Sequence, residues 1–577
     1  MQNVSWKLLA CILVCVSAFA ARADAENVVV KHFENGAGSN AVGVADASED
    51  TEIDGPQALT SGDNGDLFLL DQVNGRILRF DPRQPTTAPR VLALPTDVQP
   101  TDLVVRKSDI LVWDGSVRTL KASGGTDDGA SYRGLEETST RDADDPYVLS
   151  AFSQMGTQTP GSSVELLNPE TRAVASKQPR ARSRQYIASR GHGPVIVDVI
   201  PEAKNAAAAH IEVSVQGETS AFAKLRIEVA NRLGAVEFLE IDNNGRMYVL
   251  GEDIPPQADK AVSFVARYSD AGVLEGIYEL PFDSDVPLTR RFVTVSGDGD
   301  VYFLRTQRTG VEVVGVGFRT AGKSKVISVR PPQSALRRFA SLNGPVAAVR
   351  PVNRQNVIEN AFAFEGIQWK LTPTAYGRDP DTACTGFHRV RRPGYLQGRV
   401  NQEVRGVPYC WGCFGTLTQI RAKIDRGVLA GNVCTHNEPR SDVAGVDCSA
   451  FVSAVWGLNT HFTTDAIPSI ATQLENPWDL KPGDALDKPR SHVMLFLRFT
   501  PDRKVEVMES STGACNGRVC RNVYPLASLL ARGFRPVRFR ALANDTTVVA
   551  QATQAAEPEE NSHPRAQSHA KGRRHHH

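Results

Sequence analysis

The stretch DNNGRMYVLG, Asp242–Gly251, joins a polar turn to a run of large apolar residues. Asp, Asn and Gly favour a tight turn, and Tyr and Val after it favour a β-strand. The same order recurs in GDNGDLFLLD, Gly62–Asp71, in GDGDVYFLRT, Gly297–Thr306, and partly in SDILVWDG, Ser108–Gly115. Repeated units of this kind predict that this part of the chain is built from β-strands.

The spacing of the repeats points to a series of similar sheets. Gly245 and Gly299 lie 54 residues apart, which is close to the length of one propeller blade. Residues 50–350 are therefore similar to a β-propeller with NHL-like blades, with a long polar insertion at about residues 121–190. The acidic turns lack the 12-residue spacing and terminal Glu of a calcium loop, so tight turns explain them better.

Bulk properties predict an exported protein of more than one domain. A chain of 577 residues is too long for one hydrophobic core. The formal net charge of +0 gives no reason to expect nucleic acid as a partner. Lys7 precedes a 13-residue apolar run that is too short to span a bilayer, so residues 1–23 read as a signal peptide, with cleavage after Ala23 or Ala25. We expect a periplasmic or secreted protein with no transmembrane segment.

The composition changes near residue 371. After the signal peptide, all seven cysteines lie between residues 384 and 520. We expect the following organisation: a lead-in at 24–49, the propeller-like domain at 50–350, a connector at 351–394, a second domain at 395–542 and a disordered tail at 543–577.

Cys448 begins an apolar run in GVDCSAFVSAVWGL, Gly445–Leu458. The apolar positions have helical spacing, and Asp447 can cap the helix. A thiol at a helix N-terminus meets unpaired N–H groups and the positive end of the dipole, which favour the nucleophilic thiolate. The alternative is a buried or disulfide-bonded cysteine at a helix start.

A base and an orienting group follow downstream. His492 opens the predicted strand HVMLFLRF, and TPDR, Thr500–Arg503, predicts the turn of a hairpin. Folding about this turn sets residue 492 opposite residue 511 and makes Glu509 a diagonal neighbour of His492. Glu509 could then accept the second imidazole N–H, with Ser511 as a weaker rival.

Four motifs together resemble the NlpC/P60 cysteine peptidases. They are GVPYCWGC, GVDCSAF, DLKPGDAL and SHVMLFL, and the resemblance covers about residues 395–540. It implies a papain-like α+β fold. It also implies cleavage of peptide bonds in bacterial cell-wall stem peptides, with no metal or other cofactor.

The resemblance also implies roles for individual residues. Cys448 is the nucleophile and His492 the general base, while Tyr409, Asp447 and Ser449 line the substrate site. The chain departs from the family pattern at Ala450 and Cys413, where glycine is usual, and at Glu509, where histidine is frequent.

The expected function is therefore a peptidoglycan endopeptidase whose propeller binds wall, substrate or a protein partner, or restricts access to the cleft. Two alternatives stay open. One is a propeller adaptor with a degenerate, wall-binding peptidase domain, and the other is a related thiol amidase or acyltransferase.

A catalytic Cys448 leaves six cysteines that can pair. Cys515 and Cys520 are close in sequence around an Asn-Gly turn, so we expect them to bond. The other four can pair in three ways, of which Cys410 with Cys434 and Cys384 with Cys413 is our choice. The alternative for Cys410 and Cys413 is half of a zinc site or a redox pair.

Overall fold

The computed structural model describes most of the chain outside its two ends. The described residues are 26–45, 53–95, 98–106, 109–114, 117–122, 133–141, 183–189, 192–218, 220–282, 288–322, 326–329, 351–377, 392–432 and 442–543. The expected signal peptide, the tail beyond residue 543, Cys384 and Cys434 lie outside them. Within these ranges, no helix has both the length and the apolar character needed to cross a bilayer.

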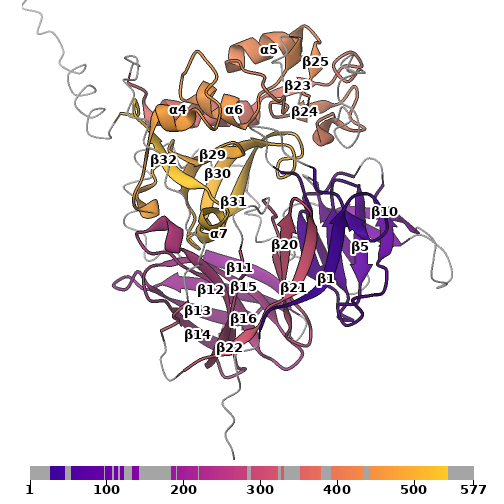
Figure 1. The fold of residues 1–577 in the computed structure, drawn as a ribbon, viewed down its shortest axis with the longest axis vertical. Helices are drawn as coiled ribbons and strands as arrows, with labels where there is room; N and C mark the ends of the chain where they lie inside the picture. Colours follow the sequence, from indigo (N-terminus) through magenta and orange to yellow (C-terminus); the bar gives the residue numbers. More distant parts are fainter. Residues whose placement is uncertain are drawn as a thin grey trace, which may run out of the picture.

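The structure is mostly β-sheet, and its N-terminal part consists of four-stranded antiparallel units (Figure 1). The first two units join into one sheet through a parallel contact of β6 with β10. Their strands are β3 (Ala58–Ser61), β4 (Leu67–Asp71), β5 (Arg76–Phe80), β6 (Arg90–Ala93), β7 (Asp102–Arg106), β8 (Asp109–Trp113), β9 (Val117–Ala122) and β10 (Arg133–Arg141). The next two units are β11 (Ser183–Ser189), β12 (Gly193–Pro201), β13 (Ala208–Val215) and β14 (Ala223–Glu228), then β15 (Leu233–Ile241), β16 (Met247–Asp253), β17 (Val262–Tyr268) and β18 (Leu274–Glu279) with β22 (Phe318–Thr320) at the edge.

A fourth sheet, which is the fifth unit, joins the two ends of this region. It contains β19 (Val293–Val295), β20 (Val301–Gln307), β21 (Gly310–Gly315), β1 (Val28–Asn35) and β2 (Ala41–Val42). In it, β1 runs antiparallel to β21 with Phe33 opposite Val311. The expectation that residues 24–49 are only a lead-in is therefore wrong. The β-branched run Val28–Val30 suits a strand, and β21 supplies its pairing partner.

The first strands of the units lie against one another. Strand β3 contacts β7 and β19, and β15 contacts β11 and β19. The Leu59 N–H donates to the Arg291 carbonyl at 2.9 Å across one of these contacts. The repeated turns lead into β4, β16 and β20 as predicted, and Gly245 and Gly299 take positive φ values of 77° and 90° in them.

The polar segment expected as an insertion at about residues 121–190 contains strands. Residues 133–141 form β10, which pairs antiparallel with β9, and residues 183–189 form β11, which pairs with β12. The sequence of β10 has no alternating apolar pattern, and β10 is a strand because its backbone pairs with β9 and β6. Residues 123–132 and 142–182 lie outside the described part.

The C-terminal part contains a six-stranded antiparallel sheet with helices packed on both faces (Figure 1). The strands, in sheet order, are β27 (Ala471–Gln473), β32 (Arg535–Phe539), β28 (Ala485–Lys488), β29 (His492–Phe499), β30 (Val505–Ser511) and β31 (Arg518–Tyr524). The helices are α4 (Arg354–Gly366), α5 (Leu417–Asp425), α6 (Cys448–Val455) and α7 (Leu526–Ala531), and the short strands are β23 (Gln368–Lys370), β24 (Glu403–Arg405), β25 (Leu429–Ala430) and β26 (Val443–Ala444). The 3₁₀ turns within the described residues are η2 (Ala258–Lys260), η4 (Gly394–Leu396), η5 (Ile467–Ser469) and η6 (Pro477–Asp479). Helix α6 packs on β29 and β30, and α4 packs on β31.

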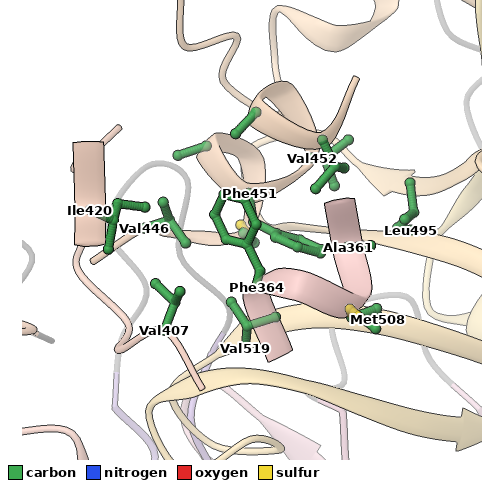
Figure 2. Close-up of a cluster of buried hydrophobic side chains, with 14 of the residues drawn as sticks. Ala361, Phe364, Val407, Ile420, Val446, Phe451, Val452, Leu495, Met508 and Val519 are labelled. Carbon is green, nitrogen blue, oxygen red and sulfur yellow. The ribbon is translucent and has the colours of Figure 1, made fainter. Parts of the chain in front are cut away.

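The segment expected as a connector is part of this C-terminal core. Asn353 caps α4 by accepting from the Gln355 N–H. Phe364 of α4 is buried and meets Phe451 of α6 edge to face, with ring centroids 5.6 Å apart (Figure 2). The expected boundary at residue 395 is therefore too late, because the apolar face of α4 completes the core against α6.

The other face of the C-terminal sheet is covered by α7 and the N-terminal part. Ile254 and Leu288 belong to one buried cluster with Met494 and Phe496. At the tip of the β29–β30 hairpin, the Val236 N–H donates to the Asp502 carbonyl at 3.2 Å. The two parts therefore share a hydrophobic core.

Candidate active site

Cys448 lies at the first position of α6 and is buried, with 1% of its surface exposed. Asp447 caps the helix as predicted, accepting from the Ala450 N–H at 2.7 Å. Among the cysteines of the described residues, Cys448 forms no disulfide. The thiol thus sits at the helix start, where backbone N–H groups lack intrahelical partners.

His492 is the first residue of β29 and lies beside this thiol. A side-chain hydrogen bond joins Cys448 and His492. The imidazole Nε2 lies 2.6 Å from Glu509 Oε2 on β30, and both side chains are at most 2% exposed. This contact leaves Nδ1 as the ring nitrogen available to the sulfur.

Toward His492 the hairpin has the register expected from the sequence, with Leu495 opposite Met508 and Phe496 opposite Val507. Next to the turn the expected register is wrong by one residue, because Phe499 lies opposite Val505 and the register shifts between Phe496 and Arg498. Glu509 contacts the imidazole as expected, and the Ser511 hydroxyl accepts from the Ala514 N–H.

Glu509 is also held at its other oxygen. Oε1 accepts from Asn522 Nδ2 at 2.7 Å and from the Tyr524 hydroxyl at 2.8 Å, both on β31. Burial works against ionisation of Glu509, but the hydrogen bonds and charge of His492 and the two further donors together hold its pKa below the usual range. The carboxylate is therefore ionised and fixed next to the imidazole.

Burial acts in the opposite direction on the thiol. It raises the pKa of Cys448, against the lowering effect of the charge and hydrogen bond of His492, and the charge of Asp447 adds to the rise. Burial therefore opposes the thiolate that the position at the helix start was expected to favour.

The three residues expected to line the substrate site surround the helix start. Tyr409 is buried and bridges to Val446 through the backbone. Asp447 Oδ2 accepts from the Gly412 N–H at 2.8 Å, and the Ser449 hydroxyl lies 2.7 Å from His461 Nε2. Both polar side chains therefore organise the loop and helix around Cys448.

Ala450, where the NlpC/P60 pattern has glycine, is accommodated within α6. It is fully buried, and its N–H is the one that Asp447 caps. The methyl group does not prevent the helix from starting at Cys448.

The disulfides agree only partly with the sequence-based choice. Cys515 and Cys520 are bonded, as predicted. Cys410 bonds to Cys413, with a Cα–Cα distance of 5.3 Å, so the predicted Cys410–Cys434 and Cys384–Cys413 pairs are wrong. The reason is local: Gly412 takes a φ of 68°, which folds the segment into a tight turn.

The bond between Cys410 and Cys413 also removes both thiolates from the zinc alternative. Across the described ranges, no group of three or more His, Cys, Asp or Glu side chains could hold a metal ion.

Sequence reasoning missed Asn522, Tyr524 and His461. Cys520, Asn522 and Tyr524 alternate along β31, and Cys520 lies opposite Glu509. The alternation of RVCRNVY after the Asn-Gly turn could have placed Asn522 and Tyr524 on the face of Glu509. No local pattern singles out His461.

Comparisons with known proteins give no family for the chain. No family model matches the sequence, and no curated protein matches it. Similar solved structures include a streptogramin B lyase, with 10% identity over 50% of this chain and 98% of the other and a TM-score of 0.21. A luciferin-regenerating enzyme has 10% identity over 49% and 97%, with a TM-score of 0.20. An inactive virginiamycin B lyase from Staphylococcus aureus has 11% identity over 48% and 82%, with a TM-score of 0.16. TM-scores of this size establish neither fold nor activity for this chain.

Proposed function

We propose that the C-terminal part, residues 351–543, is a thiol hydrolase with Cys448 as nucleophile. The observation that carries the proposal is the buried arrangement of Cys448, His492 and Glu509, in which the imidazole lies between the thiol and a fixed carboxylate. A nucleophile, a base within hydrogen-bond reach and a group that orients the base are the parts that covalent acyl transfer requires.

The mechanism follows from these positions. His492 accepts the proton of Cys448, and the sulfur attacks the substrate carbonyl to form a tetrahedral intermediate. The Cys448 backbone N–H at the start of α6 stabilises the developing oxyanion. His492 then protonates the leaving amine, and a water molecule hydrolyses the thioester with His492 as base. Throughout, Glu509 holds the tautomer and offsets the imidazolium charge.

The proposed substrate is the stem peptide of bacterial peptidoglycan. The NlpC/P60-like motifs support this substrate, together with a papain-like fold and an exported, periplasmic or secreted location. The first strands of the N-terminal units contact one another, and the two ends of this region meet in one sheet. Both observations support a propeller-like arrangement. We assign this propeller a role in binding or regulation.

The test is mass spectrometry of muropeptides after digestion of purified cell wall. Wild type is expected to release fragments cut within the stem peptide, whereas Cys448→Ala is expected to release none. Digests from both proteins that match undigested wall would refute the hydrolase proposal. A cut outside the stem peptide would favour a thiol amidase instead.

A further inference from the structure

Asn522 connects the candidate active site to the N-terminal part of the chain. Its Nδ2 donates to Glu509 Oε1 at 2.7 Å. Its Oδ1 accepts from Arg290 Nη2, which comes from the segment before β19. Arg290 also reaches the Ala514 carbonyl at 3.4 Å.

This connection fixes which way the Asn522 amide points. A guanidinium can only donate hydrogen bonds, and an ionised carboxylate can only accept them. Arg290 on one side and Glu509 on the other therefore leave one orientation, with the oxygen toward Arg290 and the NH₂ toward Glu509. Without Arg290, the amide has no charged donor that holds it in this orientation.

Arg290 stands on a rigid support. Its backbone N–H and that of Arg291 both donate to the Gln57 carbonyl, at 3.0 and 3.1 Å. The Arg291 side chain binds both oxygens of Asp102, at 3.0 and 2.8 Å. The guanidinium of Arg290 is thus presented to the C-terminal sheet from a fixed position.

We infer that Arg290 of the N-terminal β-region is a positioning residue for the catalytic group, acting through Asn522 on Glu509. The N-terminal part then completes the active site of the C-terminal part, and its docking determines how well Glu509 holds His492. This inference rests on the proposed thiol chemistry of Cys448.

The experiment measures thiolate formation directly. The ultraviolet absorbance of the thiolate is recorded against pH, as the difference between each full-length protein and the same protein carrying Cys448→Ala. This readout requires neither a substrate nor access of a reagent to the buried sulfur. The charged or titratable groups that face the thiol and its base are His492, Glu509 and Asp447, with Tyr524 behind Glu509.

Arg290→Ala is expected to raise the pH midpoint of thiolate formation by about half a unit to one unit. A Glu509 carboxylate that is no longer held in place stabilises the positive charge of protonated His492 less well, and the Cys448 thiolate forms together with that charge. The shift corresponds to about three to ten times less thiolate below the midpoint. Arg290→Lys restores a donor and is expected to recover part of the shift.

The matched control is Arg503→Asn. Arg503 donates to the Ala206 and Leu233 carbonyls at the far end of the same interface, and Asn tolerates its φ of 64°. This variant weakens docking without touching Asn522, so its midpoint is expected to equal that of wild type. Equal midpoints for Arg290→Ala and Arg503→Asn would overturn the inference.

Asn522→Ala provides a second test from the other side of the contact. It is expected to raise the midpoint as Arg290→Ala does, and the double variant is expected to show no further rise. Additive shifts would show that Arg290 acts by another route. A wild type that titrates as described but leaves cell wall intact would refute the proposed substrate while leaving this inference in place.

Discussion

Glu509→Gln tests the orientation of the base by a change of one atom. In the wild type, Glu509 Oε2 faces His492 Nε2, and Oε1 accepts from Asn522 and Tyr524. A glutamine keeps the two donors of β31 satisfied only if its oxygen takes the place of Oε1. Its NH₂ then faces Nε2, which must become the acceptor. The imidazole proton moves to Nδ1, and the nitrogen that should accept the thiol proton is lost.

The expected magnitude follows from this reversal. The same carboxylate-to-amide change in a Ser-His-Asp triad lowers turnover by about 10⁴, so we expect a loss on the order of 10³ to 10⁴ in the rate of stem-peptide cleavage. The fold should change little. Gln keeps both hydrogen bonds from β31, so we expect the free energy of unfolding to change by less than about 1.5 kcal/mol.

The assay is the rate of muropeptide release, with denaturant unfolding of the same preparation. The control is Glu506→Gln on the same strand. Glu506 is equally buried, and it pairs with Arg498 and Arg521 away from the thiol. Its activity per folded molecule should stay within about threefold of wild type, although the loss of one partner of a buried ion pair is expected to lower the unfolding free energy. A Glu509→Gln variant that keeps more than about a tenth of wild-type activity would refute the orienting role, because the wrong tautomer cannot serve as the base.

Two further predictions concern stability. Burial raises the pKa of Glu252 from its usual 4.5 to about 7, so the unfolding free energy that is highest below about pH 4.5 falls as the pH rises toward 7. Glu252→Gln should remove this pH-dependent loss of unfolding free energy, which is worth about 3 kcal/mol in the wild type. Urea unfolding of both proteins at pH 5 and pH 8 measures it. The same change in unfolding free energy between these pH values in both proteins would contradict the prediction. Replacing Cys515 and Cys520 together by Ser opens a loop with a sequence separation of 5 and should cost about 2 kcal/mol. The replacement should also lower the cleavage rate, because Asn522 Nδ2, which donates to Glu509, lies 3.3 Å from the Cys520 sulfur. An unchanged unfolding free energy and an unchanged cleavage rate would show that the disulfide does not hold Asn522 in place.

Local signals in the sequence predicted the repeated turns, the strands that follow them and the central pair of the site. The Asp/Asn/Gly turns preceded β4, β16 and β20 because glycine and a following apolar run specify both parts of the unit. The His492–Glu509 contact was predicted from the register of the hairpin, which fixes the face of each side chain. The predicted register holds at this end only because a one-residue shift between Phe496 and Arg498 offsets the different register next to the turn.

The remaining features depend on partners far away in sequence. Strand β10 is polar and exists because β9 and β6 offer it hydrogen bonds. The N-terminal strand β1 pairs along most of its length with β21, about 280 residues later. Arg290 reaches Asn522 only because the two parts of the chain dock. The Cys410–Cys413 bond is different: the spacing allowed it, but sequence could not choose among the possible pairings.

The most direct test of the account is to detect the acyl-enzyme on Cys448. Wild type and Cys448→Ala are mixed with purified cell wall and stopped with acid at short times, and the peptide that contains residue 448 is weighed by mass spectrometry. The account predicts that the wild-type peptide gains the mass of the acyl part of a cut stem peptide, and that the variant neither gains this mass nor releases product. Release of stem-peptide fragments at the same rate by both proteins would contradict it.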